Sequence, residues 1–165
     1  MESIRFVVNA APASFTYTLG LQDLMRLAYP LSQGLRPGIV VALWGDLGAG
    51  KTTFARILLQ ALVGKSIDVP SPTFTLVQTY DCIHGEVWHC DLYRLKYAEE
   101  VFEIGLEDAF HQAICLIEWP ERLGYLLPRH RIDIAFKIVD ESTREITLNL
   151  IGSHDALRTL LDTPA

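Results

Sequence analysis

Residues 39–53 read IVVALWGDLGAGKTT, and this stretch predicts a strand, a glycine-rich loop and the first turn of a helix. Residues 39–44 are a continuous apolar run, which is typical of a strand buried on both faces of a parallel sheet. Beyond the loop, apolar side chains recur at positions 54, 57, 58, 61 and 62, which form one face of an α-helix. Strand, loop and helix therefore follow one another in the order that a phosphate-binding loop requires.

Residues 45–52, GDLGAGKT, match the complete pattern G-x-x-x-x-G-K-[ST] of a phosphate-binding loop. Backbone N–H groups converge on phosphate oxygens only where the chain lacks Cβ atoms and reaches positive φ, which explains the three glycines. We expect Lys51 to bridge the β- and γ-phosphates of ATP and the Thr52 hydroxyl to bind Mg²⁺. The alternative is a glycine-rich turn that opens an ordinary helix, but the strand before the loop favours phosphate binding. The residues expected to bind the nucleotide here are Gly45, Asp46, Leu47, Gly48, Ala49, Gly50, Lys51, Thr52 and Thr53.

Length and charge limit the classes of protein and partner. A chain of 165 residues suits a single domain, residues 1–165, that can bury a full core. Lys and Arg number 14 against 20 Asp and Glu, so the formal net charge is −6 and there is no overall basic character for nucleic acid. We therefore expect contact with RNA only through a partner protein.

Cysteine usage and hydropathy bear on the compartment. The three cysteines, Cys82, Cys90 and Cys115, cannot all pair with one another, which favours a reducing environment. The longest apolar run, residues 39–44, is far too short to cross a bilayer, and the N-terminus shows no signal pattern. We expect a cytoplasmic protein that does not associate with a membrane.

Two carboxylates follow predicted strands. Asp91 comes directly after a strand at residues 87–90, and Glu118 ends the apolar run of residues 113–117. Open α/β sheets bind ligands at the carboxyl ends of their strands, so we expect both acids near the loop. Glu118 is then a ligand of Mg²⁺ or a water-positioning residue, and Asp91 acts on the metal or the attacking water. The alternative for Asp91 is a turn or helix cap. The expected catalytic set is Lys51, Asp91 and Glu118, and the metal set is Thr52 and Glu118.

A proline-rich segment precedes the first of these acids. Prolines at 70 and 72 favour an extended chain that presents the hydroxyls of Ser71 and Thr73 at fixed positions, as a γ-phosphate-sensing loop needs. The alternative is a stiff connection to the strand that follows. We expect residues 74–80 and 87–90 to pair around a turn at residues 83–85.

Cysteines and histidines near this turn raise the possibility of zinc. Cys82, His84, His89 and Cys90 lie close together in the sequence. His89 and Cys90 are adjacent on a predicted strand, so their side chains point to opposite faces and cannot converge on one ion. The pattern therefore disfavours a zinc site.

The flanking segments complete an α/β fold. We expect a strand at residues 4–8, a connection at 9–14 and a helix at 19–29 that stops at Pro30. Residues 98–112 predict one or two short helices with an acidic face.

Near the C-terminus, residues 132–136 and 144–150 alternate as in an antiparallel hairpin, and Arg144 either reaches the nucleotide or lies on the surface. The predicted fold is a P-loop NTPase-like three-layer α/β sandwich, with a mostly parallel central sheet and antiparallel hairpin additions.

Four phrases resemble the TsaE family, also called YjeE, the small bacterial ATPase of tRNA threonylcarbamoyladenosine formation. They are GDLGAGKTT at 45–53, SPTFTLV at 71–77, HCDLYRL at 89–95 and ICLIEWPERLG at 114–124, and the likeness covers nearly all of residues 19–150. The resemblance implies an Mg²⁺-dependent ATPase that is weak alone. It also implies association with the two protein subunits of the bacterial threonylcarbamoyl-transfer complex, which ATP turnover resets, and contact with tRNA only through them.

The resemblance also implies roles for particular residues. Residues 48–53 would hold the phosphates of ATP or ADP, and Thr52 and Glu118 the metal. Asp91 would lie at the attacking water or γ-phosphate, and Thr73 in the sensing loop. Glu121 and Arg144 match nucleotide-contacting positions of the family.

Two other functions remain open. A small-molecule kinase needs an acceptor pocket and an arginine-bearing lid, but the close basic pair, Arg129 and Arg131, leads into a strand. A GTPase is disfavoured because the sequence has no N-K-x-D guanine reader. The non-catalytic alternative is a nucleotide-gated binding subunit whose hydrolysis is incidental.

Overall fold

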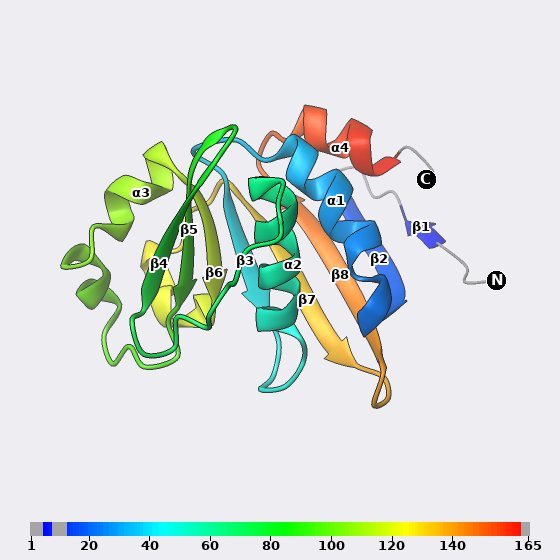
Figure 1. Ribbon diagram of the computed structural model, residues 1–165, viewed down its shortest axis with the longest axis horizontal. Coiled ribbons are helices and arrows are strands. Elements are labelled where there is room, and N and C mark those ends of the chain that lie inside the picture. The colour runs from blue at the N-terminus through cyan, green and yellow to red at the C-terminus, as the bar shows by residue number, and fades with distance from the viewer. Residues whose placement is uncertain (1–4, 8–12, 163–165) are drawn as a thin grey trace.

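One mixed sheet organises the chain in the computed structural model, which describes residues 5–7 and 13–162 (Figure 1). Its eight strands run in the spatial order β1-β2-β8-β7-β3-β6-β5-β4. The strands are β1 (Arg5–Val7), β2 (Ala13–Gly20), β3 (Val40–Trp44), β4 (Val77–Cys82), β5 (Gly85–Asp91), β6 (Ile114–Glu118), β7 (Arg131–Ile138) and β8 (Thr143–Ile151). The α-helices are α1 (Met25–Gly34), α2 (Lys51–Val63), α3 (Leu106–Gln112) and α4 (Asp155–Asp162), and the 3₁₀ helices are η1 (Leu21–Asp23), η2 (Ala98–Phe102) and η3 (Pro120–Leu126).

The centre of the sheet is parallel and its two edges are antiparallel. Strand β3 pairs in parallel with β6 and β7, and β6 pairs in parallel with β5. At one edge β4 returns antiparallel to β5, and at the other β7, β8, β2 and β1 form an antiparallel series. The predicted fold class is confirmed, although the antiparallel series is longer than a single added hairpin.

Two hydrophobic cores lie on opposite faces of the parallel strands. On β3, Val41 and Leu43 belong to the first core and Val40 to the second, because successive side chains on a strand alternate. Helices α1, α2 and α4 bury their apolar faces in the first core, and η2, α3 and η3 bury theirs in the second. This arrangement makes the three layers.

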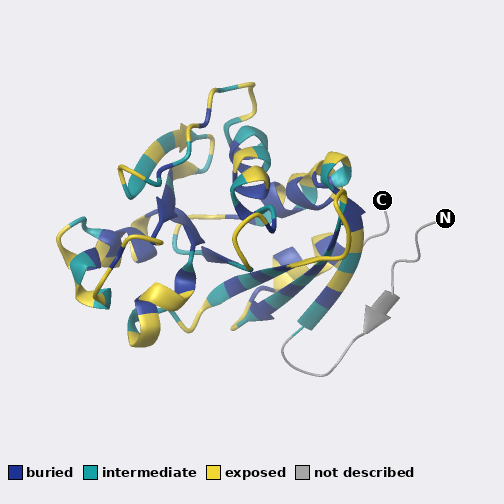
Figure 2. Ribbon diagram, turned by 90° about the horizontal axis from the view of Figure 1, so that it is seen from below, coloured by how far each residue is buried: buried dark blue, intermediate teal, exposed yellow. Residues whose placement is uncertain are grey.

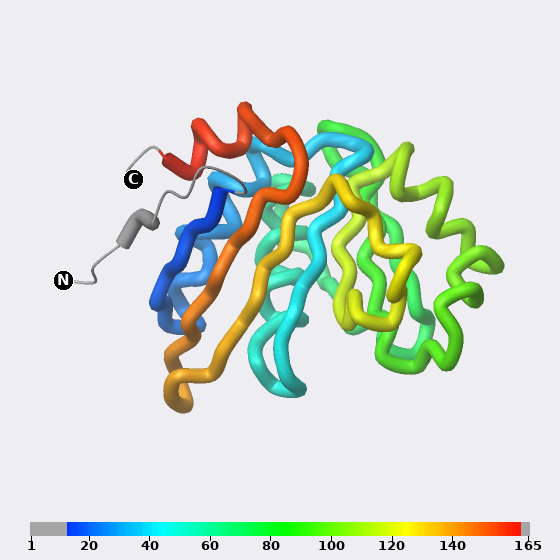
Figure 3. Tube along the Cα trace, turned by 180° about the vertical axis from the view of Figure 1, so that it is seen from behind, coloured from blue at the N-terminus to red at the C-terminus, as the bar shows by residue number. Residues whose placement is uncertain are grey.

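The antiparallel part of the sheet is covered on one face only. Along β8 every second residue is buried, whereas β6 is buried throughout, and the banding is visible in Figure 2. Figure 3 shows β2, β8 and β7 from the side that no helix covers within the described residues. The parallel strands therefore have layers on both sides, and the antiparallel strands on one.

The N-terminal prediction is partly wrong. Residues 13–20 form strand β2, which the sequence analysis did not predict, and β2 pairs with β8 along its whole length. Strand β1 lies within the strand predicted at residues 4–8. The other residues of that strand, and residues 9–12 of the connection predicted at 9–14, fall outside the described residues.

The predicted helix also has different bounds. Helix α1 begins at Met25 and passes through Pro30 to Gly34 instead of stopping. A proline inside a helix costs roughly 3 kcal/mol. Leu27, Ala28 and Leu31 are almost fully buried around it, and their packing offsets that loss.

The other predicted elements are confirmed with small shifts. The hairpin of β4 and β5 begins at Val77 because residues 72–75 form a turn. The expected helical region at 98–112 is divided into η2 and α3 by Gly105, whose φ is 75°. The C-terminal hairpin is β7 and β8. Among the described helices, none combines the length and the hydropathy needed to cross a membrane.

Candidate functional site

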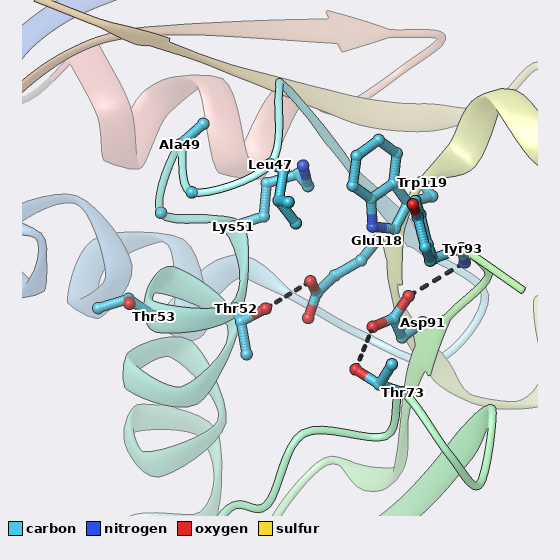
Figure 4. A pocket seen from close by; sticks show the side chains of 12 residues that line it. Leu47, Ala49, Lys51, Thr52, Thr53, Thr73, Asp91, Tyr93, Glu118 and Trp119 are labelled. Carbon is cyan, nitrogen blue, oxygen red and sulfur yellow. Dashed lines mark hydrogen bonds between the residues drawn. The ribbon is translucent and has the colours of Figure 1, made fainter.

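A cavity of about 320 Å³ opens at the carboxyl ends of the parallel strands. Figure 4 shows the side chains that surround it. It is lined by Leu47, Gly48, Ala49, Gly50, Lys51, Thr52, Thr53, Thr73, Asp91, Tyr93, Glu118 and Trp119. The loop after β3 thus meets the residues that end β5 and β6.

Strand register brings the two predicted acids together. Asp91 and Glu118 are register partners at the ends of the parallel strands β5 and β6, and Glu118 is also paired with Leu43 of β3. Because these strands share one direction, their last residues lie at the same edge of the sheet. The two acids come from segments 27 positions apart in the sequence, yet both line the cavity.

The glycines of the loop are required by its shape. Gly45 has a φ of 142°, and a Cβ there would lie 2.7 Å from the carbonyl oxygen of Phe136. Gly50, at the N-cap of α2, has a φ of 107°, which a side chain would strain. The loop therefore places the first turn of α2, with its unpaired backbone N–H groups and positive helix end, against the cavity.

Arg144 holds the loop from outside the cavity. Its side chain is buried, and Nε donates to the carbonyl oxygen of Ala49 at 2.9 Å. Nη1 donates to the carbonyl oxygens of Asp140 at 2.8 Å and Thr143 at 3.0 Å. In a trans peptide the N–H points away from the carbonyl, so this contact directs the N–H of Gly50 away from Arg144. Arg144 does not line the cavity; it contacts the loop that does.

Lys51 lies between the loop and an indole ring. Its Nζ donates to the carbonyl oxygens of Gly45 and, at 3.0 Å, Asp46, and lies 3.8 Å from the centroid of the Trp119 ring. Burial lowers the pKa of Lys51, and nearby carboxylates, Glu118 first, oppose that shift. The ammonium is thus largely removed from water, and a charge-assisted hydrogen bond from it to a phosphate would be strengthened by this environment.

Glu118 is fixed at both carboxylate oxygens. The Thr52 hydroxyl donates to Oε2 at 2.7 Å, and Nε2 of His89 lies 2.8 Å from Oε1 (Figure 4 draws the first contact). Glu118 and His89 are 1% and 0% exposed, so both contacts lie in an environment with little water. The predicted metal pair, Thr52 and Glu118, is therefore in direct contact.

Asp91 is held by the proline-rich segment. Thr73 Oγ1 donates to Oδ2 at 2.8 Å, and the N–H of Tyr93 donates to Oδ1 at 3.0 Å. The Ser71 and Thr73 hydroxyls are themselves 2.7 Å apart. Leu76, which follows this segment, has a φ of 64°, a strained value for leucine that often marks a functional site. The predicted sensing segment thus contacts the predicted catalytic acid.

The donor chemistry fits Mg²⁺ better than zinc. Mg²⁺ takes hard oxygen ligands, usually one or two carboxylates with waters and phosphates, and the Thr52 hydroxyl and Glu118 carboxylate supply such oxygens. His89 faces Glu118, whereas Cys90 lies in the second core, as their adjacency on a strand predicts. Within the described residues, no three His, Cys, Asp or Glu side chains form a group that could hold a metal.

Four of the residues predicted to bind the nucleotide do not line the cavity: Gly45, Asp46, Glu121 and Arg144. Of these, Glu121 is exposed on η3. Glu121 is nevertheless close enough to Lys51 for its charge to oppose the lowering of the lysine pKa by burial.

Sequence reasoning missed Tyr93 and His89. The rings of Tyr93 and Trp119 lie 5.0 Å apart at the cavity wall, and Trp119 has a φ of 59°. His89 lies two residues before Asp91 on β5, so strand alternation could have placed both on one face.

Together, the strand, glycine-rich loop and helix at the carboxyl edge of a sheet with helices on both faces of its parallel centre define the P-loop NTPase-like class. The crystal structure of YdiB from Bacillus subtilis is similar to this chain, with a TM-score of 0.73, 29% identity and coverage of 93% of this chain and 95% of that one. The chain belongs to the TsaE family, because the family model described as "Threonylcarbamoyl adenosine biosynthesis protein TsaE" matches residues 20–146.

Curated relatives agree with this assignment. The tRNA threonylcarbamoyladenosine biosynthesis protein TsaE of Rickettsia bellii is 42% identical over 123 residues, which cover 74% of this chain and 85% of that protein. The protein of the same name from Bacillus subtilis is 40% identical over 137 residues, covering 82% of this chain and 85% of its own length. The resemblance seen in the sequence is therefore confirmed.

Proposed function

We propose that this protein binds and hydrolyses ATP with Mg²⁺ and acts in the threonylcarbamoyladenosine modification of tRNA. Membership of the TsaE family supports the role in this pathway. The observation that carries the ATPase assignment is the convergence of Lys51, Thr52, Asp91 and Glu118 on one cavity beside a complete phosphate-binding loop. One domain in the cytoplasm would carry the activity.

Each side chain has a role that follows from its position. The N–H groups of residues 48–53 and the Lys51 ammonium bind the phosphates. Thr52 and Glu118 hold Mg²⁺, which when bound would neutralise charge on the phosphate oxygens. Asp91, already accepting from Thr73, orients the attacking water, and Thr73 responds to the γ-phosphate.

We further propose that hydrolysis is slow in the isolated protein and is stimulated by the two subunits of the threonylcarbamoyl-transfer complex. Asp91 accepts from Thr73 at one oxygen and from the N–H of Tyr93 at the other, so the direction of its free lone pairs depends on the position of the proline-rich segment. A partner that docks at this segment would shift Thr73 and turn the carboxylate toward the attacking water. The net charge of −6 supports contact with tRNA through those subunits instead of directly.

An assay of phosphate release with and without the two partner proteins tests this function. We expect slow release by the protein alone and faster release in the presence of both partners, with none from the Lys51→Ala variant. Absence of release in both conditions would contradict the ATPase assignment. Transfer of labelled phosphate to a nucleoside or other hydroxyl acceptor would indicate a kinase.

The same buried arrangement also suits a nucleotide-gated binding subunit, because Thr52 and His89 hold Glu118 in place without any reaction. The Glu118→Gln variant separates the two functions. Loss of hydrolysis together with a stalled partner complex supports the ATPase. Unchanged cycling of the complex despite lost hydrolysis supports the binding subunit.

A further inference from the structure

His89 is a buried polar residue beside the cavity that the proposed function does not use. It lies on β5, with its side chain fully buried beneath the carboxylate that ends the neighbouring strand β6. We propose that His89 is a positioning residue that fixes the Glu118 carboxylate in the orientation needed to hold Mg²⁺. This inference rests on the proposed function of the cavity.

The hydrogen bonding of the imidazole points to Glu118 alone. A carboxylate can only accept, so Nε2 of His89 carries the hydrogen and donates it to Oε1 at 2.8 Å. Nδ1 is buried without a hydrogen-bond partner, the only side-chain atom in that state among the described residues. Glu118 is thus the one hydrogen-bond partner of the His89 side chain among the described residues. Nδ1 therefore stays unpaired in the core, and the single hydrogen bond of the imidazole goes to Glu118, the proposed metal ligand.

Glu118 needs a second donor for a geometric reason. Its other oxygen, Oε2, accepts from the Thr52 hydroxyl at 2.7 Å. Thr52 and Glu118 are themselves the residues that would hold Mg²⁺, so with the ion present His89 would be the contact that fixes the carboxylate from outside the metal site. Partners of this kind behind a ligand typically contribute 10-fold to 100-fold in metal affinity.

Two substitutions separate the hydrogen bond from the volume of the ring. His89→Gln places an amide N–H at about the reach of Nε2, whereas His89→Leu fills similar space without a donor. Mn²⁺ binding to the complex of protein and a non-hydrolysable ATP analogue, followed by electron paramagnetic resonance, is the readout. We expect His89→Leu to weaken Mn²⁺ binding by about 10-fold to 100-fold and His89→Gln to stay close to wild type. Affinity for the analogue without metal should be the same in all three.

Val87 provides the control for general damage to the core. It is fully buried on the same face of β5, two residues before His89, and belongs to the first core. Val87→Ala should lower the thermal unfolding temperature without changing Mn²⁺ affinity. If His89→Leu does not fold, His89→Met replaces it as the donor-free variant, since methionine adapts to irregular space.

The outcomes are distinct. If wild-type protein binds neither the analogue nor Mn²⁺, the proposed function fails. If wild type binds both and the donor-free variant binds Mn²⁺ equally well, the role of His89 is overturned while the function stands. Equal weakening by His89→Gln and His89→Leu would likewise overturn it, because only the shape of the ring would then matter.

Discussion

The two halves of the sheet contribute to the site in different ways. In the parallel half, β3, β5 and β6 end at one edge, where they deliver the phosphate-binding loop, Asp91 and Glu118. In the antiparallel half, neighbouring strands alternate in direction, and β8 contributes only Arg144, which holds the loop from outside. Shared strand direction therefore gathers the chemical groups, and the antiparallel strands support them.

The same difference appears in burial. The parallel strands are enclosed on both faces, and the buried polar side chains His89, Asp91 and Glu118 lie there. Enclosure removes water, so each remaining hydrogen bond determines where an oxygen points. We expect substitutions in the parallel half to change binding and turnover, and substitutions in the antiparallel half to act through the loop or on stability alone.

The largest effect is expected at the loop of the parallel half. Lys51→Ala removes a charge-assisted phosphate contact worth about 1.5–3 kcal/mol, so nucleotide binding should weaken accordingly and turnover should be lost. Isothermal titration calorimetry and phosphate release measure the two effects. Lys65→Ala removes an exposed lysine beyond the end of α2 that does not line the cavity, so it is a matched control and should bind nearly as wild type. Turnover at the wild-type rate in Lys51→Ala would defeat the loop assignment.

A substitution of Asp91 tests whether the acid at the end of β5, in the parallel half, takes part in hydrolysis. Asp91→Asn keeps an oxygen that can accept from Thr73 but removes the charge that orients and activates water. We expect turnover to fall by about 10²-fold or more, as for loss of a general base, while nucleotide affinity changes much less. Single-turnover kinetics beside equilibrium binding gives this comparison. Equal losses in both quantities would show that Asp91 is structural.

Arg144 sharpens the comparison from the antiparallel half. Arg144→Met leaves the carbonyl oxygen of Ala49 without its buried donor, at a cost of roughly 1–3 kcal/mol. Because the contact acts through the loop, nucleotide affinity should fall by less than in Lys51→Ala, and bound ATP should turn over at a near-normal rate. Arg144→Lys retains the charge without the planar guanidinium, so its nucleotide affinity should lie between those of the wild type and Arg144→Met. A loss of turnover at saturating ATP would mean that Arg144 reaches the reacting phosphate.

The smallest effect is expected at the far end of the antiparallel half. His154 stacks on His130 with ring centroids 4.2 Å apart, and burial lowers the pKa of His154 from 6.5. The folded state therefore binds a proton less readily than the unfolded chain, so stability falls as the pH drops below 6.5 through the lowered pKa. Urea unfolding at a series of pH values should show this slope in the wild type and a shallower one in His154→Gln. Identical slopes in the two proteins would exclude His154 as the source of the pH dependence of stability. ATPase activity should not differ between the wild type and His154→Gln.

Much of the fold and site follows from local sequence signals. The apolar runs before the loop and before Glu118 predicted β3 and β6, since such short runs are typical of a parallel strand covered on both faces. The loop pattern also predicted the backbone conformation of the loop, because glycine is needed where φ is positive or where a neighbouring backbone approaches closely.

What the sequence could not predict depends on distant partners. Strand β2 is defined by its pairing with β8, more than 120 positions later, and α1 passes Pro30 because its neighbours are packed in the core. His89 had no local signal for its contact with Glu118, since that contact requires the register of β5 with β6. Arg144 was expected at the nucleotide or on the surface, and it lies buried behind the loop because β8 passes there.

The most direct test of the central claim is a crystal structure of the protein with Mg²⁺ and a non-hydrolysable ATP analogue. We predict phosphates enclosed by residues 48–53, with Lys51 turned toward them, and a metal ion between the Thr52 hydroxyl and the Glu118 carboxylate, with Asp91 facing the terminal phosphate. An analogue bound elsewhere, or an empty loop with Asp91 and Glu118 directed away from it, would contradict the account.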